Sequence, residues 1–294
     1  MTAAGAGTDC VRRLLFEELD IRGALVQLHG CWQRMHAGRD YAEVVRRALG
    51  EMTAVTALIA CNLKQPGRLT FQAQGDGPVS LLVIDCTADL RLRGMAKAAP
   101  DARASTITGL LGSGKLVLTL QPESTEQTYQ SIVPLQGETV ASVFEHFLAQ
   151  SEQQPTRLLL RASETTAAGL FLQKMPGADQ RDPDGWQRLQ HLAATIAARE
   201  LEQLPPEELL AKIFANETVR LFDAQPLAYD CPENPDKVRA MLRSLGREEV
   251  DAILRERGEV VVRDDMCNHV YRFDAAAIEE IFGGSTGPAS RTLH

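Results

Sequence analysis

Two stretches near the carboxyl end of the chain each combine one cysteine with acidic residues in a turn-like setting, "YDCPENPDKV" and "DDMCNHVYRF". The first contains the spacing C-x-E, with Cys231 and Glu233, and the second contains D-x-x-C, with Asp264 and Cys267. Zinc accepts carboxylate oxygen beside thiolate sulfur, usually in sets of four ligands. These four residues are therefore a candidate metal site, although chance placement of acidic residues near cysteines remains an alternative.

The other cysteines and the histidines are weaker candidates for a metal or thiol site. His269 follows Cys267 by two residues and could be a ligand, but its position favours a solvated turn residue. No H-x-x-x-H pair occurs among the histidines. Three cysteines lie among apolar neighbours and are predicted to be buried and unreactive: Cys31, Cys61 and Cys86. Cys10 is predicted to start a helix and has no assigned role.

A glycine-rich segment, "GLLGSGKL", nearly fits the phosphate-binding pattern G-x-x-x-x-G-K-[ST]. Leu116 stands where that pattern needs a hydroxyl for magnesium, and a strand rather than a helix is expected to follow. A glycine-rich connection into a strand is the favoured interpretation, so nucleotide hydrolysis is rejected.

The elements that would position these residues follow from hydrophobic spacing. A helix is predicted from Thr8 to about Leu19, then a strand at 21–28, and a buried helix from Tyr41 to about Leu63. The turn "GDGP" predicts a hairpin. Further strands are expected in "GKLVLTLQP", "TYQSIVPL", "TRLLLRAS" and "GLFLQKM", with an amphipathic helix in "GETVASVFEHFLAQSEQ".

A polar segment rich in proline and glycine, "MPGADQRDPDG", marks a domain boundary. The fold class predicted is α+β, with a larger sheet-and-helix domain at residues 1–178 and a helical linker at 179–226. A small metal-binding-like domain follows at 227–283, and the tail at 284–294 is expected to be disordered. A domain of about 60 residues often needs a metal or another staple.

Composition narrows the class of protein. The chain has 294 residues, 44% hydrophobic residues and a formal net charge of −8. An acidic chain lacks the basic surface that nucleic-acid binders use to neutralise phosphates. No apolar run is long enough to span a membrane and no signal peptide is visible. We therefore expect neither a nucleic-acid nor a membrane partner, and a cytoplasmic location where thiols stay reduced.

Many segments, in order along nearly the whole chain, resemble one family. They include "ALGEMTAVTALIACNLKQPGRLTFQAQGDGPVSLLVID", "RLRGMAKA", "TYQSIVPLQGETVASVFEHFLAQSEQQPT", "LLAKIFANETVRLFD" and "LRSLGREEVDAILRERGEVVVRDDMCNHVYRFDAAAIEEIF". The chain is similar to the redox-regulated heat-shock holdases, the 33 kDa chaperonins of the bacterial cytosol. The resemblance implies a non-enzymatic stress-response chaperone that binds unfolded or misfolded client proteins without ATP and forms a homodimer on activation.

The family's carboxyl-terminal domain carries a C-x-C and a C-x-x-C pair that bind zinc when reduced and form disulfides within the pairs when oxidised. When this sequence is matched to the family, Cys231 stands at the first position of the C-x-C pair and Glu233 replaces the second cysteine. Asp264 replaces the first cysteine of the C-x-x-C pair, and Cys267 keeps the last position. A carboxylate can bind zinc but cannot form a disulfide, so the only bond available in this domain joins Cys231 to Cys267.

Two interpretations of this site compete. Either zinc binds the two thiolates and two carboxylates, or metal is lost and the domain folds on its own core. Ligand-competent carboxylates at both replaced positions favour zinc, bound more weakly than by four thiolates. Because neither disulfide within a pair can form, we expect a holdase opened by heat or unfolding conditions more than by peroxide. The alternatives are an enzyme that binds a small molecule or anion through "GDGP" and "GLLGSGK", and a constitutive interaction module without chaperone activity.

Overall fold

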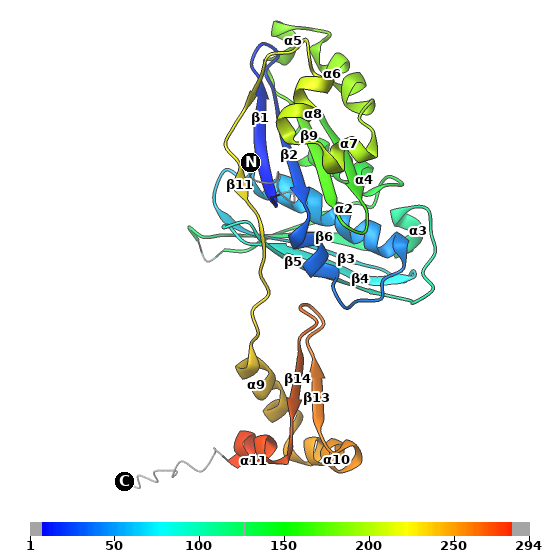
Figure 1. The fold of residues 1–294 in the computed structure, drawn as a ribbon, viewed down its shortest axis with the longest axis vertical. Coiled ribbons are helices and arrows are strands. Elements are labelled where there is room, and N and C mark those ends of the chain that lie inside the picture. Colours follow the sequence, from blue (N-terminus) through cyan, green and yellow to red (C-terminus); the bar gives the residue numbers. More distant parts are fainter. Residues whose placement is uncertain (1–7, 126, 284–294) are drawn as a thin grey trace, which may run out of the picture. The chain divides into compact units, whose positions relative to one another are not determined.

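The structure, a computed structural model, describes residues 8–125 and 127–283. Contacts divide the chain into two units, Met1–Asp230 and Cys231–His294, here called the amino-terminal and carboxyl-terminal units. The helices predicted as a linker belong to the first unit by their contacts. The predicted tail at 284–294 lies outside the described residues. Figure 1 labels most of the elements of both units.

The first sheet of the amino-terminal unit is antiparallel, with strand order β10-β1-β2-β9-β8, and β11 also pairs with β1. Its central strand, β2, is buried along almost its whole length, because other parts of the unit cover both of its faces. The strands are β1 (Cys10–Phe16), β2 (Ile21–Leu28), β8 (Thr156–Ala162), β9 (Ala167–Lys174), β10 (Val219–Leu221) and β11 (Gln225–Pro226).

The second sheet has the order β12-β5-β4-β3-β6-β7. The predicted "GDGP" hairpin is present and joins β3 to β4, with Phe71 opposite Ile84. Only the short β12 runs parallel to its neighbour, β5. The strands are β3 (Gly67–Gln74), β4 (Val79–Cys86), β5 (Arg91–Ala98), β6 (Lys115–Pro122), β7 (Tyr129–Val133) and β12 (Ala228–Tyr229).

Helix α2 (Glu43–Ala60) fills the space between the two sheets. It is buried on several sides, as its apolar spacing predicts, and its Leu49, Val55 and Leu58 belong to one core with residues of both sheets. Helix α4 (Val140–Ser151) adds Phe144, whose ring packs edge-on against Phe71 at 4.8 Å. Two shorter helices complete this region, α1 (Gly30–His36) and α3 (Ile107–Leu111).

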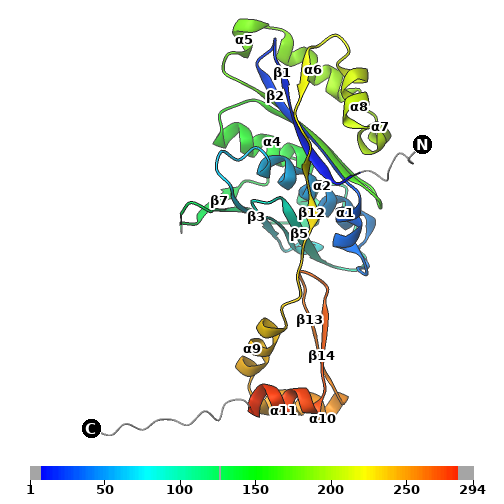
Figure 2. The same cartoon turned by 60° about the vertical axis from the view of Figure 1, so that its left-hand side comes forward.

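A separate set of helices covers the opposite face of the first sheet (Figure 2). It consists of α5 (Ala178–Arg181), α6 (Gly185–Ala194), α7 (Ala198–Gln203) and α8 (Pro206–Ile213). Proline stands in the first turn of α8, where its missing N–H costs nothing. After α8 the chain returns as an extended segment through β10, β11 and β12, which we call the strap, residues 219–229.

The carboxyl-terminal unit has its own small core. Helices α9 (Pro235–Leu245) and α10 (Arg247–Arg257) meet at Gly246, which has a φ of +96° that favours glycine. Strands β13 (Val260–Arg263) and β14 (Val270–Phe273) form a hairpin, and α11 (Ala275–Gly283) follows. The sequence pattern of this region predicts a helix broken at Gly246, two strands and a closing helix, and all of these elements are present.

The prediction for the amino terminus is wrong. The segment expected to be a helix from Thr8 to about Leu19 forms β1, paired with β2 on one side and with the strap on the other. Leu14 and Phe16 face the helices α6–α8, while Val11 enters the core around α2. Tertiary pairing on both edges outweighs the helical spacing of the leucines.

Candidate thiol and metal site

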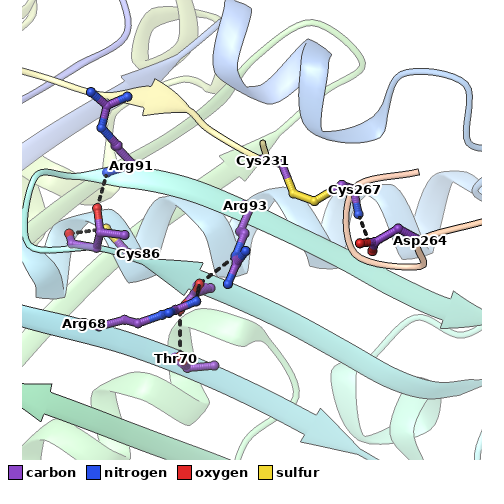
Figure 3. Close-up of polar contacts among 10 residues, drawn as sticks. Arg68, Thr70, Cys86, Arg91, Arg93, Cys231, Asp264 and Cys267 are labelled. Carbon is purple, nitrogen blue, oxygen red and sulfur yellow. Dashed lines mark hydrogen bonds and ion pairs between the residues drawn. A yellow bond between two sulfur atoms is a disulfide. The ribbon is translucent and has the colours of Figure 1, made fainter. Parts of the chain in front are cut away.

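Cys231 and Cys267 lie together in the carboxyl-terminal unit and are joined by a disulfide, with their Cα atoms 5.7 Å apart (Figure 3). Cys231 precedes α9 and is buried, while Cys267 lies half-buried in the loop between β13 and β14. The two stretches singled out in the sequence therefore form the two sides of one site. Its two sulfurs come from positions 36 residues apart in the chain.

Asp264 organises the loop that carries Cys267. One oxygen of its carboxylate accepts hydrogen bonds from the backbone N–H groups of Met266, at 2.8 Å, and Cys267, at 3.2 Å. Its own backbone N–H donates to the carbonyl of His269 at 2.9 Å, and its carbonyl accepts from Asn268 at 2.7 Å. This carboxylate has a structural role that the sequence did not reveal: it caps the turn at the tip of the hairpin.

His269 and Tyr271 connect the two halves of the site. The Nε2 atom of His269 lies 2.7 Å from the carbonyl oxygen of Cys231, and the hydroxyl of Tyr271 accepts the backbone N–H of Asn234 at 2.8 Å. His269 is therefore not the solvated turn residue that the sequence favoured. Glu233 is exposed, and its Oε1 lies 3.9 Å from Nδ1 of His269.

The structure shows the site with its two cysteines joined in a disulfide, so it does not test zinc binding by the reduced site. Within residues 8–125 and 127–283, no group of three or more His, Cys, Asp and Glu side chains is arranged to hold a metal ion. Sulfurs in a disulfide are not thiolates, and thiolates are the form that binds metal. By residue type alone, the thiolates of Cys231 and Cys267 and the carboxylates of Glu233 and Asp264 are ligands that zinc accepts. Zinc binding by these residues stays a prediction.

The free thiols of the amino-terminal unit are poor nucleophiles. Burial raises the pKa of Cys31, Cys61 and Cys86 to about 12, so these groups stay protonated at neutral pH. Cys10, on β1 rather than a helix, also has a raised pKa because of burial. Cys31 and Cys86 are buried as predicted, whereas Cys61 is half-buried and that part of the prediction is wrong. The raised pKa values of all three thiols agree with the predicted lack of reactivity.

The two glycine-rich loops pack on each other rather than around a ligand. The carboxylate of Asp76, in "GDGP", accepts the backbone N–H of Ser113 at 2.7 Å, and the N–H of Gly77 donates to the carbonyl of Leu111 at 3.1 Å. A Cβ atom at Gly77 would collide with the backbone at Leu110 and Leu111. These contacts explain the glycines, and they occupy N–H groups that an anion cradle would need.

A charged cluster on β3, β4 and β5 is structural. The buried Asp85 accepts from Nε of Arg68 at 2.7 Å, from Nε of Arg93 at 2.8 Å and from the hydroxyl of Thr70 at 2.8 Å (Figure 3). Burial alone would raise the pKa of Asp85, but the hydrogen bonds from Arg68, Thr70 and Arg93 outweigh it, so the pKa is lowered. The cluster ties three strands together.

The apolar face of the first sheet is the other functional candidate. Phe16, Ile21, Leu25 and further side chains of β1, β2 and β9 are buried beneath α6–α8. The ring of Phe214, at the end of α8, packs edge-on against Phe16 with centroids 5.0 Å apart. The helices above this face are short and largely polar on their outer side. Only a few short elements therefore cover the apolar surface.

Two hydrogen bonds donated by one buried side-chain amide hold these helices to the sheet. Nε2 of Gln27, on β2, donates to the carbonyls of Leu201 and Leu204 at the end of α7, each at 2.9 Å. Arg12 of β1 forms an ion pair with Glu207 of α8. Arg188 of α6 also pairs with Glu217, which precedes β10. The rest of the cover relies mainly on apolar packing, which the sequence could not assign to a particular sheet face.

Comparison with known proteins identifies the class. Residues 9–274 match the family model described as "Hsp33 protein". A 33 kDa chaperonin from Methylobacillus flagellatus is 39% identical over 94% of this chain and 94% of its own length. Another, from Nitrosococcus oceani, is 39% identical over 97% of this chain and 99% of its own length.

The fold agrees. The crystal structure of the 33 kDa chaperonin (heat shock protein 33 homolog) from Thermotoga maritima superposes with a TM-score of 0.78, covering 95% of this chain and 99% of that chain at 20% identity. The protein is a chaperone of mixed α and β structure, and the chain belongs to the Hsp33 family. Its relatives are named as chaperonins and not as enzymes. Among the residues that the structure describes, no helix is long and apolar enough to cross a membrane.

Proposed function

We propose that this protein is an ATP-independent holdase of the cytoplasm, which binds unfolding proteins during heat stress and catalyses no reaction. The observation that carries the proposal is the apolar face of the first sheet, hidden under the short helices α6–α8 and anchored through Phe16 and Phe214. A surface of this kind favours association with exposed apolar segments of other chains once it is uncovered.

Opening is proposed to begin in the carboxyl-terminal unit. Within its described part, residues 231–283, this unit has a small core of eight buried apolar residues, so its folding is expected to be marginal. The strap enters it directly, since Asp230 precedes Cys231. Unfolding of the unit would release the end of the strap, whose β10 and β11 pair with β1, and so loosen the cover over the apolar face.

Heat is proposed as the main trigger. With Glu233 and Asp264 in place of two family cysteines, disulfides within the two pairs cannot form. In the reduced cytosol the two thiolates and two carboxylates would hold zinc, which would staple the folded unit. Assembly into a homodimer on activation is part of the same proposal and follows the family resemblance.

Light scattering of a heat-denatured client protein tests the function. Wild-type protein should suppress aggregation as the temperature rises. Truncation of the anchor, Phe214→Ala, removes about 3–5 kcal/mol of packing free energy beneath α8 and should lower the temperature at which suppression begins.

Ile132→Ala is the matched control, because Ile132 lies on β7 of the second sheet with its side chain 71% exposed. It should behave as wild type. If neither the wild type nor Phe214→Ala suppresses aggregation at any temperature, the holdase proposal fails. In that case a constitutive interaction module becomes the better account of the fold.

A further inference from the structure

We infer that the Cys231–Cys267 disulfide staples the carboxyl-terminal unit in its folded state, so that oxidation keeps the holdase closed and reduction in the absence of zinc releases it. The inference rests on the proposed function, in which unfolding of this unit starts activation. It gives peroxide the opposite effect from the one that the family's C-x-C and C-x-x-C pairs would give.

The position of the bond is the first reason. It joins the residue that begins the unit to the loop between β13 and β14, and the loop it closes contains α9, α10 and β13. Half of the unit's eight core residues therefore lie inside the loop: Val238, Leu242, Val250 and Val260. Unfolding the unit with the bond intact leaves this whole segment tethered at both ends.

The entropy of the unfolded chain determines that the disulfide stabilises the folded unit. A cross-link between residues 36 apart removes much more freedom from the unfolded ensemble than from the folded one, and the gain grows with loop length. A bond within a C-x-C or C-x-x-C pair would link near neighbours and constrain almost nothing. Oxidation to one long-range bond therefore adds a staple to this unit, whereas bonds within the pairs would add none.

The bond coexists with the other contacts of the folded site. In the same structure Asp264 caps the loop of Cys267, and Tyr271 and His269 contact the backbone of Asn234 and Cys231. The core of the unit is closed in the same structure. Oxidation and native packing are therefore compatible here, as a stapling bond requires.

The chemistry needs only a peroxide. Cys267 is the more exposed thiol, so its thiolate attacks the peroxide oxygen first and forms a sulfenic acid, releasing one water from hydrogen peroxide. The thiol of Cys231 then displaces the hydroxyl as a second water, and the S–S bond forms. Two thiols lose two electrons and two protons in total, and one peroxide is reduced to two waters.

The test compares the full-length protein treated with hydrogen peroxide and the same protein reduced by a phosphine with a metal chelator present. Mass spectrometry after alkylation verifies the bond. Amide hydrogen exchange over residues 231–283 should be slower in the oxidised form, and the melting temperature of this unit should rise by about 10–20 °C. Suppression of client aggregation should begin at a correspondingly higher temperature.

Cys267→Ser removes the bond and should make the oxidised and reduced samples alike, whereas Cys61→Ser, which removes a half-buried thiol of the other unit, should behave as wild type. Failure of peroxide to form the bond overturns the inference. Faster exchange or earlier client protection in the verified oxidised protein does the same. Hydrogen exchange decides the staple even if no sample acts as a holdase, so failure of the proposed function is recognised separately.

Discussion

Burial raises the pKa of the Glu51 carboxyl on α2 to about 7, even though Arg47 and Arg161 act in the opposite direction. The folded state therefore holds a proton that the unfolded chain, with an ordinary carboxyl pKa, releases at lower pH. Stability from this group is fully present below the unfolded pKa and is lost as the pH rises towards 7. Glu51 lines a cleft together with Arg47, Glu138 and Arg161.

Glu51→Gln should abolish this loss of folding stability with rising pH. We expect the free energy of unfolding of the amino-terminal unit to rise by about 1–3 kcal/mol at pH 8, with little change at pH 4.5. Both tryptophans, Trp32 and Trp186, lie in this unit, so fluorescence during denaturant unfolding reports on it. Glu123→Gln, at an exposed position, should be neutral at both pH values. An equal gain at both pH values would show that Glu51 does not titrate in this way.

Among single elements, α9 carries the clearest contrast between buried and exposed leucines. Leu242 is 1% exposed and belongs to the core of the carboxyl-terminal unit, whereas Leu245, three residues later on the same helix, is 51% exposed. A two-stranded hairpin such as β13–β14 is not stable alone, so the packing of α9 on it decides whether the unit folds.

Leu242→Ala should therefore cost about 2–5 kcal/mol, which is comparable with the whole stability of so small a unit. We expect fast amide exchange throughout residues 231–283 at room temperature and client protection without heating. Leu245→Ala should change neither measurement. If Leu242→Ala leaves client protection dependent on heat while its carboxyl-terminal unit is unfolded, activation does not begin in this unit.

The elements that the sequence predicts well are those with one strong local signal. The "GDGP" turn, the long apolar helix α2 and the break between α9 and α10 at Gly246 need no tertiary information. Residues 10–16 were predicted wrongly because the helical spacing of Leu14 and Leu15 is local, whereas the partners that make β1 a strand, β2 and the strap, are not. The strap itself, at β10, is about 200 residues from β1.

The part of the candidate site that depends on residue types and family register was predictable, and the part that depends on the folded path of the chain was not. Residue types and family register brought Cys231 and Cys267 together, and the structure joins them. The roles of Asp264, as the cap of a turn, and of His269, as a bridge to the backbone of Cys231, depend on the folded path of the hairpin. The same carboxylate can serve a turn or a metal, and only geometry distinguishes these uses.

At the scale of the whole molecule, two units of very different size should unfold in separate steps. The amino-terminal unit has two sheets around a continuous core, and the carboxyl-terminal unit has a hairpin with three helices. Calorimetry of the reduced protein should show a small transition at low temperature, from the carboxyl-terminal unit, before a larger one.

Zinc should act on the first transition alone, because its predicted ligands, Cys231, Glu233, Asp264 and Cys267, all lie in the carboxyl-terminal unit. At about one hundred times its dissociation constant, zinc would stabilise the folded unit by about 2.7 kcal/mol and raise its melting temperature by about 10–20 °C. Elemental analysis of the reduced protein should find about one zinc per chain, and none in Cys231→Ala/Cys267→Ala. A metal-free wild type whose first transition ignores added zinc would remove zinc from the proposal. Heat and the thiol pair would then be left as the controls of opening.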